Sequence, residues 1–154
     1  MKTRLASVAV LAGVLAVAVL APSASTAGHS AKSGTTLHYR VLFAPFNVLD
    51  LGKKGPSAGD EMIFHDVLVD ASGKRVGHDG FVCTVTNPVG PEAECTLTLS
   101  LPGGIVTTQF LNSPPPLNVA AITGGTGRYV GARGEVTIVE SSRDQTGSVT
   151  VELK

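Results

Sequence analysis

The sequence predicts an all-β protein that folds as a single eight-stranded antiparallel barrel, and three observations lead to this prediction. Between residues 37 and 153, apolar and polar residues alternate with a period of two in eight short runs. Segments rich in Gly, Pro, Asn and Ser separate these runs, as turns do. No stretch longer than about two helical turns has the period of a helix. Eight strands suffice to close a barrel whose interior holds side chains or one small ligand.

The N-terminal segment is typical of a signal for secretion. A positively charged start precedes an apolar run over Leu5–Ala21, and small residues follow up to a plausible cleavage site near Ala27. We therefore expect residues 1–27 to be a cleaved secretory signal peptide and residues 28–36 to be a flexible leader. A retained N-terminal anchor is the alternative, because the apolar run is just under a comfortable membrane-spanning length.

Composition limits the partners of the remaining chain, residues 37–154, which has a length that suits one domain. The 12 basic and 12 acidic residues balance, so there is no electrostatic reason to expect nucleic acid or an anionic membrane as a partner. No later segment is long and apolar enough to cross a bilayer. No nucleotide, protease or metal motif is present, and we expect no cofactor and no metal.

The first two predicted strands differ in pattern. The run LHYRVLF at 37–43 places Leu, Tyr, Val and Phe on one face, with His and Arg opposite. The run EMIFHDVLVD at 61–70 is apolar on both faces, and Asp66 shares a face with Phe64 and Leu68. A lone carboxyl among apolar neighbours makes Asp66 a candidate functional residue. His65 and Asp66 point to opposite faces of a strand, so they cannot chelate one metal ion together.

The third and fourth runs, at 80–86 and 94–100, form a predicted hairpin. If Val89 lies near its apex, Cys83 and Cys95 stand directly opposite each other on the apolar face, close enough for a disulfide. Two cysteines in an exported chain also favour one disulfide. The alternative is a free nucleophilic thiol that a nearby His would activate.

The last four runs keep the alternation and are expected to complete the barrel at 104–111, 117–123, 134–140 and 147–153. Between the sixth and seventh lies AITGGTGRYVGARGEV, whose glycine spacing is similar to that of a nucleotide-binding loop. Such a loop requires a following helix. Here a run of period two follows, and too few residues remain for a crossover helix. We therefore expect a barrel corner in which the glycines serve backbone geometry.

At this point the sequence resembles a known family. AITGGTGRYVGARGEV is similar to the hallmark segment of allene oxide cyclases and dirigent proteins, and the block from Gly59 to Val85 is similar to a block of the cyclases. The resemblance extends from Leu37 to the C-terminus. It implies a calycin-type eight-stranded barrel that holds a small hydrophobic or phenolic molecule in its lumen. It also implies a homo-oligomer, commonly a trimer.

The resemblance implies four site residues. Asn47 matches a lumen Asn of the cyclases, whereas the cyclase Glu falls on Pro45 and a second Asn is replaced by Asp66. Asp66 also matches the acidic position of the dirigent F-x-D-x-L strand, and Arg133 matches the Arg of the dirigent loop. We expect Asp66 and Arg133 near one barrel mouth, with Tyr129 beside the arginine. The alternative is that Asp66 and Arg133 form a buried ion pair or a turn anchor.

The functional prediction is a secreted barrel that binds a small hydrophobic or phenolic ligand and steers its cyclisation or coupling. An enzyme of this kind would be an isomerase or cyclase of the allene oxide cyclase type, with catalytic candidates Asp66, Asn47, Arg133 and Tyr129. The alternative is a non-catalytic secreted structural or interaction protein, stapled by its disulfide, whose lumen is filled by its own core.

Overall fold

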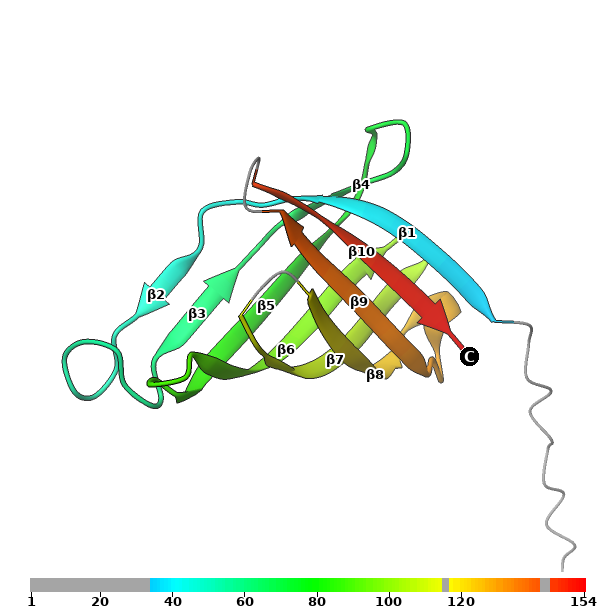
Figure 1. The fold of residues 1–154 in the computed structure, drawn as a ribbon. Helices are drawn as coiled ribbons and strands as arrows, with labels where there is room; N and C mark the ends of the chain where they lie inside the picture. The colour runs from blue at the N-terminus through cyan, green and yellow to red at the C-terminus, as the bar shows by residue number, and fades with distance from the viewer. Residues whose placement is uncertain (1–33, 115–116, 142–144) are drawn as a thin grey trace, which may run out of the picture. The chain divides into compact units, whose positions relative to one another are not determined.

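The chain forms a closed eight-stranded antiparallel barrel, which confirms the predicted fold class (Figure 1). The computed structural model describes residues 34–114, 117–141 and 145–154. The predicted signal peptide and residues 28–33 of the predicted leader lie outside the described residues, while Thr35 and Thr36 of that leader belong to β1. No helix in the described part of the chain is long and apolar enough to cross a membrane.

Ten strand segments and one short helix make up the described chain. The first five are β1 (Thr35–Leu42), β2 (Asn47–Leu49), β3 (Glu61–Phe64), β4 (Val67–Val69) and β5 (Arg75–Asn87). The others are β6 (Glu92–Leu101), β7 (Gly104–Asn112), β8 (Leu117–Gly125), the 3₁₀ helix η1 (Gly127–Tyr129), β9 (Gly134–Ser141) and β10 (Thr146–Leu153). Most segments begin and end close to a predicted alternating run, but β2 lies outside all eight runs, and β5 begins at Arg75, before the predicted run at 80–86.

Eight strands arise from ten segments because the first two strands are each broken once. β1 and β2 follow one another along the wall, as do β3 and β4, and the long strand β5 pairs with both β4 and β3. The neighbours then run β5–β4–β1–β10–β9–β8–β7–β6, and pairing of β5 with β6 closes the ring. β2 and β3 extend beyond the barrel at one end, on the left in Figure 1.

The break in the predicted strand at 61–70 lies at His65 and Asp66, and side-chain hydrogen bonding explains it. The backbone N–H of Asp66 donates to the carboxylate of Asp79 at 3.1 Å, and the backbone N–H of Asp79 donates to the carbonyl of Asp66 at 3.0 Å. A carboxylate thus takes the place of a ladder partner, as Asp side chains readily do. The sequence predicted one continuous strand here because a period of two does not reveal such a substitution.

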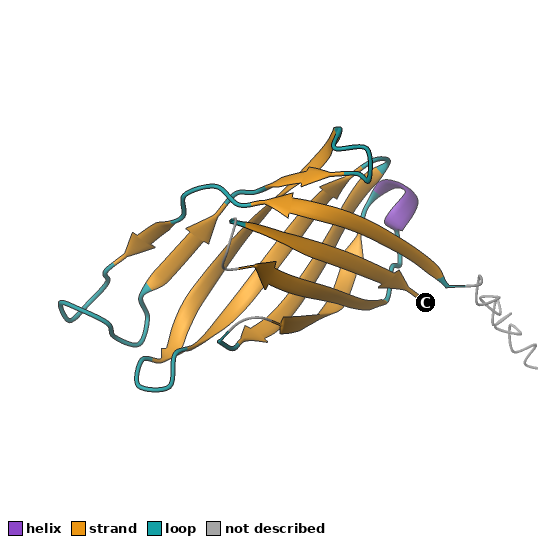
Figure 2. Cartoon of the chain, turned by 45° about the horizontal axis from the view of Figure 1, so that its top comes forward, coloured by secondary structure: helices purple, strands orange, loops and turns teal. Residues whose placement is uncertain are grey.

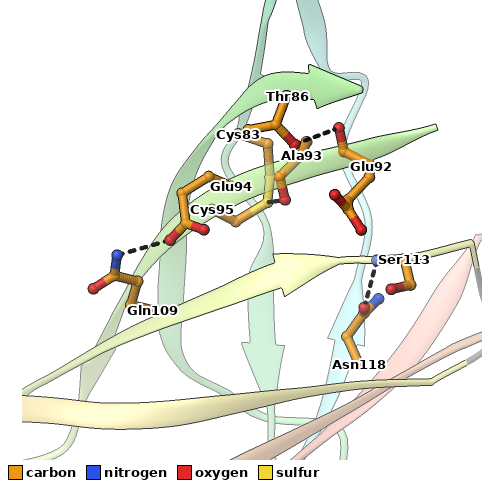
Figure 3. Close-up of a disulfide and its surroundings, with 9 residues drawn as sticks. All are labelled: Cys83, Thr86, Glu92, Ala93, Glu94, Cys95, Gln109, Ser113 and Asn118. Atoms are coloured by element: carbon orange, nitrogen blue, oxygen red, sulfur yellow. Dashed lines mark hydrogen bonds between the residues drawn. A yellow bond between two sulfur atoms is a disulfide. The ribbon is translucent and has the colours of Figure 1, made fainter. Parts of the chain in front are cut away.

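The disulfide joins β5 to β6, as predicted (Figure 3). Cys83 and Cys95 are directly paired in the register, with Cα atoms 4.1 Å apart, and neither side chain is exposed. The described residues contain no free cysteine.

The barrel core is filled at the end that contains η1. This end is opposite the β2–β3 extension in Figure 2. The largest fully buried apolar side chains come from six strands, and they are Val41, Leu68, Leu99, Val106, Val136, Val149 and Val151. Alternation in each strand sends these residues inward, which buries the apolar area that stabilises the fold.

The glycine-rich segment forms a corner at the filled end. η1 follows β8, and its N–H groups bond to the β6–β7 turn, with Arg128 N donating to Gly103 O at 2.9 Å. A Cβ atom on Gly125 would lie 2.6 Å from two carbonyl oxygens, so only glycine allows this approach. The strand β9 begins directly afterwards, with no crossover helix.

Candidate functional site: a carboxyl cluster in an aromatic cavity

A cavity of about 590 Å³ opens at the barrel end opposite η1. It lies where β1 gives way to β2 and where β3 gives way to β4, because both breaks leave the wall without a continuous ladder. Its apolar lining is Phe43, Ala44, Pro45, Phe46, Phe64 and Phe81, and its polar lining is Asp66, Glu140, Ser141 and Gln145. The volume falls within the range of about 300–1,000 Å³ that is usual for small-molecule sites.

Three phenylalanine rings stack along one side of this cavity. The rings of Phe46 and Phe64 have centroids 5.1 Å apart, and those of Phe64 and Phe81 lie 4.0 Å apart and are almost parallel at 5°. Phe64 and Phe81 are directly paired across β3 and β5, so the sheet register holds their rings together. The stack offers a flat apolar face that continues outward to Phe46, whose side chain is 53% exposed.

A fourth ring, that of Phe43, closes the opposite side. It lies over β10, where a Cβ atom on Gly147 would come within 2.7 Å of its ring. Glycine at 147 is therefore required for the ring to lie against the strand. The cavity thus has aromatic side chains on two sides.

Asp66 is the most deeply buried polar residue of the cavity wall, with 1% of its surface exposed. One carboxylate oxygen, Oδ1, accepts a hydrogen bond from Ala44 N at 2.7 Å. The other, Oδ2, is buried and has no hydrogen-bond partner among the described residues. Burial raises the pKa of Asp66, although the hydrogen bond from Ala44 and the nearby His65 oppose the rise.

Two more carboxyl groups interact with Asp66. Burial, and then the negative charge of Asp66, raises the pKa of Asp79 to about 6. Burial and the same charge also raise the pKa of Glu140, which projects inward from β9. Each member of this carboxyl cluster (Asp66, Asp79 and Glu140) therefore favours protonation more than a free carboxyl does. The cluster can hold or exchange a proton close to neutral pH, which is a common property of functional sites.

The structure does not bring Arg133 to this cavity, so the expectation that Asp66 and Arg133 share one mouth is wrong. Arg133 precedes β9, whereas Glu140 near the end of β9 lines the cavity with Asp66. Seven residues of strand separate these positions, or roughly 23 Å. The Arg133 side chain is exposed, and its carbonyl accepts a hydrogen bond from Lys154 N at 2.9 Å.

The other two predicted residues also lie outside the cavity. Tyr129 is buried in η1 at the filled end, where its hydroxyl donates to Pro102 O at 3.2 Å. Asn47 is exposed on β2 and is directly paired with Ile63, which in turn pairs with the exposed Val82. Paired residues share a face, so Asn47 points to the outer face. Of the four candidates, only Asp66 lines the cavity.

Sequence reasoning missed several cavity residues. Glu140 could have been found, because it continues the inward face of Val136 and Ile138 in the alternating run of β9. Asp79 lies just before the predicted run at 80–86 and was not a candidate, yet it is buried within β5. The stack of Phe46, Phe64 and Phe81 had no local signal, since three segments contribute one ring each.

A second depression, of about 670 Å³, lies on the outer wall. It is shallower, and exposed residues such as His38, Arg40 and Ser148 line it. It holds no buried polar group without a partner, because the one such atom among the described residues belongs to Asp66. The cavity at the barrel mouth is therefore the candidate site.

Comparison with known proteins is consistent with this barrel. The family described as the allene oxide cyclase barrel-like domain matches residues 43–153. A pyocyanin demethylase is 33% identical, with a TM-score of 0.69 over 78% of this chain and 100% of that protein. A search of curated proteins finds no match.

Two further solved structures share the fold at lower identity. A pterocarpan synthase dirigent protein is 19% identical, with a TM-score of 0.64 over 90% of this chain and 96% of that protein. A Diels–Alderase from Streptomyces koyangensis is 13% identical, with a TM-score of 0.63 over 77% of this chain and 63% of that protein. Because the family match spans most of the barrel, the chain belongs to the allene oxide cyclase barrel-like domain family.

Proposed function

We propose that this protein binds a small aromatic molecule in the cavity at the barrel mouth and steers a reaction of that molecule there. The observation that carries the proposal is that Asp66, whose buried Oδ2 atom has no hydrogen-bond partner among the described residues, lines a cavity of about 590 Å³. A buried carboxylate oxygen without a partner is costly to the fold, so such an atom at a cavity wall is best explained by a ligand.

The aromatic walls support a planar ligand of hydrophobic or phenolic character. A flat ring system can pack against an open end face or the edges of the three-ring stack and bury area at about 25 cal/mol per Å². The demethylase that is 33% identical acts, by its name, on pyocyanin, which is a planar tricyclic aromatic compound. We therefore take planar polycyclic aromatics as the first ligands to test.

The chemistry that the site supports best is proton transfer to or from a bound ligand. Asp66 and Glu140 line the cavity, and burial raises the pKa of both. Such a group is able both to accept and to return a proton. An isomerisation or ring closure needs no more than this and a fixed orientation of the ligand. Asp66 remains the proposed catalytic residue, whereas Arg133, Tyr129 and Asn47 would act only at a distance.

The test is calorimetric titration of the mature protein with pyocyanin and with a series of simple phenols. We expect saturable binding of at least one of them and a loss of binding in Asp66→Asn. Asp50→Asn is the matched control, because Asp50 is an exposed carboxyl whose hydrogen bond to Gly55 N lies outside the cavity. If no planar aromatic or phenol binds the wild-type protein, the alternative of a structural protein without a ligand is favoured.

We further infer an extracytoplasmic location after cleavage near Ala27, supported by the buried disulfide, which persists in an oxidising compartment. N-terminal sequencing of the exported protein tests the cleavage site.

A homo-oligomer, commonly a trimer in the family that the sequence resembles, is also expected. Exposed Leu117, Val119 and Val139 on the outer wall support it. Light scattering of the mature protein tests it, and a monomer at all concentrations would contradict it.

A further inference from the structure

The polar lining of the cavity is acidic. Among the described residues that line it, two carry a carboxyl group, Asp66 and Glu140, and none is Lys, Arg or His. Asp79 adds a third carboxyl, which meets the backbone of Asp66 at 3.1 Å. The charges of the described cavity residues therefore favour positive charge in a ligand and oppose negative charge.

The Oδ2 atom of Asp66 can accept a hydrogen bond from a ligand. Ala44 N donates to Oδ1 at 2.7 Å, while Oδ2 is buried without a partner among the described residues and Asp66 lines the cavity. A ligand N–H, O–H or cationic nitrogen placed there would satisfy it. A ligand carboxylate would instead meet a like charge in a buried site.

The aromatic stack adds to this selection. The faces of aromatic rings carry negative potential, and the faces of Phe64 are covered by Phe46 and Phe81, so a cationic ring gains a cation–π interaction only at an open end face of the stack. Phe64 and Phe81 lie almost parallel at 4.0 Å, and Asp66 belongs to the same stretch of chain as Phe64. One flat cation can therefore contact both the rings and the carboxyl group.

We propose that the ligand of this cavity is a planar aromatic that brings a cationic nitrogen or a hydrogen-bond donor to Asp66, and that aromatic carboxylates are excluded. This proposal rests on the proposed function for the existence of a ligand, and it names the class to which that ligand belongs.

Binding of such a cation is linked to pH. The titratable groups whose charges interact with Asp66 are Asp79 from β5, Glu140 from β9 and His65 from its own stretch of chain. His78 from β5 is exposed and lies against the ring of His65, with ring centroids 5.2 Å apart. Protonation of the carboxyl cluster removes the charge that attracts the cation. The pKa of Asp79 is about 6, and those of Asp66 and Glu140 are also raised. Affinity for a cation therefore rises as pH increases through about 6, while affinity for a neutral ring of the same shape does not change.

Three phenazines that share one ring system test this: N-methylphenazinium, phenazine and phenazine-1-carboxylate, titrated in the dark at pH 7.5 and pH 5. At pH 7.5 we expect the cation to bind about 10- to 100-fold more tightly than the neutral ring, through the attraction of its charge to the carboxyl groups, because N-methylphenazinium has no N–H or O–H to donate. The carboxylate binds more weakly than either. At pH 5 the preference for the cation shrinks.

Asp66→Asn keeps the shape of the side chain and removes its charge, so it should bring the affinity for the cation down to that for phenazine while leaving phenazine itself unchanged. Glu140→Gln is the second variant, needed if Asp66→Asn fails to fold, and it should reduce the same preference. Asp50→Asn is the control and should change neither affinity. Thermal melts followed by circular dichroism report folding for each variant.

The outcomes separate the two proposals. If phenazine and the cation both bind with equal affinity, or the carboxylate binds most tightly, the assignment of ligand class is overturned while ligand binding stands. If none of the three binds, and no phenol or pyocyanin binds either, the proposed function itself fails.

Discussion

At the scale of single residues, the carboxyl cluster is where this fold departs from an ordinary apolar core. Asp66, Asp79 and Glu140 lie close enough that the charge of Asp66 raises the pKa of the other two. An exposed set of carboxyls would titrate near pH 4 and cost nothing to the fold. Here burial raises the free energy of the ionised carboxylates, so the carboxyl cluster lowers the free energy of unfolding at neutral pH.

The first prediction concerns pH and stability. Because folding raises the pKa of Asp79 from 3.8 to about 6, the native state binds more protons than the unfolded state between these values. The free energy of unfolding should therefore increase as pH falls from about 7 to about 5. Asp66 and Glu140 act in the same direction. Denaturant unfolding across this range measures the effect.

Asp60 and Asp70 act in the opposite direction, because backbone and side-chain hydrogen bonds lower their pKa values. Their contribution to stability is lost only as pH falls below about 4. The change in stability between pH 7 and pH 5 therefore reports the carboxyl cluster.

The second prediction isolates Asp79. Asp79→Asn keeps an oxygen for the N–H of Asp66 and removes the buried charge. At pH 7.5 it should raise the free energy of unfolding by about 1–3 kcal/mol and flatten the rise between pH 7 and pH 5. Denaturant unfolding of the variant, with Asp50→Asn as the control, provides the measurement. A variant less stable than wild type at pH 7.5 would contradict the prediction.

At the scale of elements, the hairpin and the glycine corner fix the barrel covalently and sterically. The disulfide ties β5 to β6 at a directly opposed pair, where the register places both cysteines inward. The corner at η1 joins β8 to β9 through glycines that meet neighbouring carbonyls. Neither feature touches the cavity, so both affect stability rather than ligand choice.

The third prediction concerns the disulfide. Its two cysteines are 12 residues apart, and a closed loop of this size contributes about 3 kcal/mol by the chain-entropy argument. Replacing both Cys83 and Cys95 with alanine should lower the free energy of unfolding by at least this amount. Denaturant midpoints without reductant measure the loss. Titration of the native wild-type protein with a thiol reagent should find no free thiol, and two free thiols would refute the pairing in solution.

The fourth prediction compares two glycines near the corner. Gly134 has φ +130°, and a Cβ atom there would collide with the carbonyl of Glu152, so Gly134→Ala should cost more than about 2 kcal/mol. Gly131 has φ +75° with open space around it, so Gly131→Ala should cost only about 1 kcal/mol of backbone strain. Thermal melts of both variants test the difference, and equal losses would argue against the steric explanation.

At the scale of the described barrel, the core is packed near η1 and around the disulfide, and a cavity opens beside the β2–β3 extension. Fully buried side chains such as Leu99 and Val136 belong to this core, whereas neither lines the cavity. The packed core supplies the hydrophobic stabilisation that a barrel of this size needs. This division leaves the cavity free to hold a ligand.

The fifth prediction follows from that division. Leu99→Ala, in the packed core, should lower the free energy of unfolding by about 2–5 kcal/mol and leave ligand affinity almost unchanged. Phe46→Ala, at the half-exposed end of the aromatic stack, should cost less than about 1 kcal/mol but weaken binding of planar ligands. Parallel denaturation and calorimetry of the two variants test this, and a reversed pattern would count against a divided lumen.

Particular residues show how much the sequence predicts. Alternation predicted most of the strands, the inward direction of Leu99 and Val136, and the opposed cysteines, because a period of two is a local property of the chain. It did not predict β2 or the break between β3 and β4. Asp66 also stood out, since it interrupts an otherwise apolar strand. The resemblance to a family suggested Asn47, Arg133 and Tyr129 as site residues. Such a resemblance matches positions along the chain, but it does not show at which end of the barrel a residue lies.

The sequence by itself therefore determined the fold class, the disulfide and one residue of the candidate site. Only the tertiary structure decided at which end of the barrel the cavity opens, that Arg133 lies roughly 23 Å along the strand from Glu140, and that three phenylalanines stack beside a carboxyl cluster. The physical reason is that cavities, stacks and pKa shifts depend on distances between segments far apart in the chain. Those distances are set when β5 pairs with β6 and closes the ring.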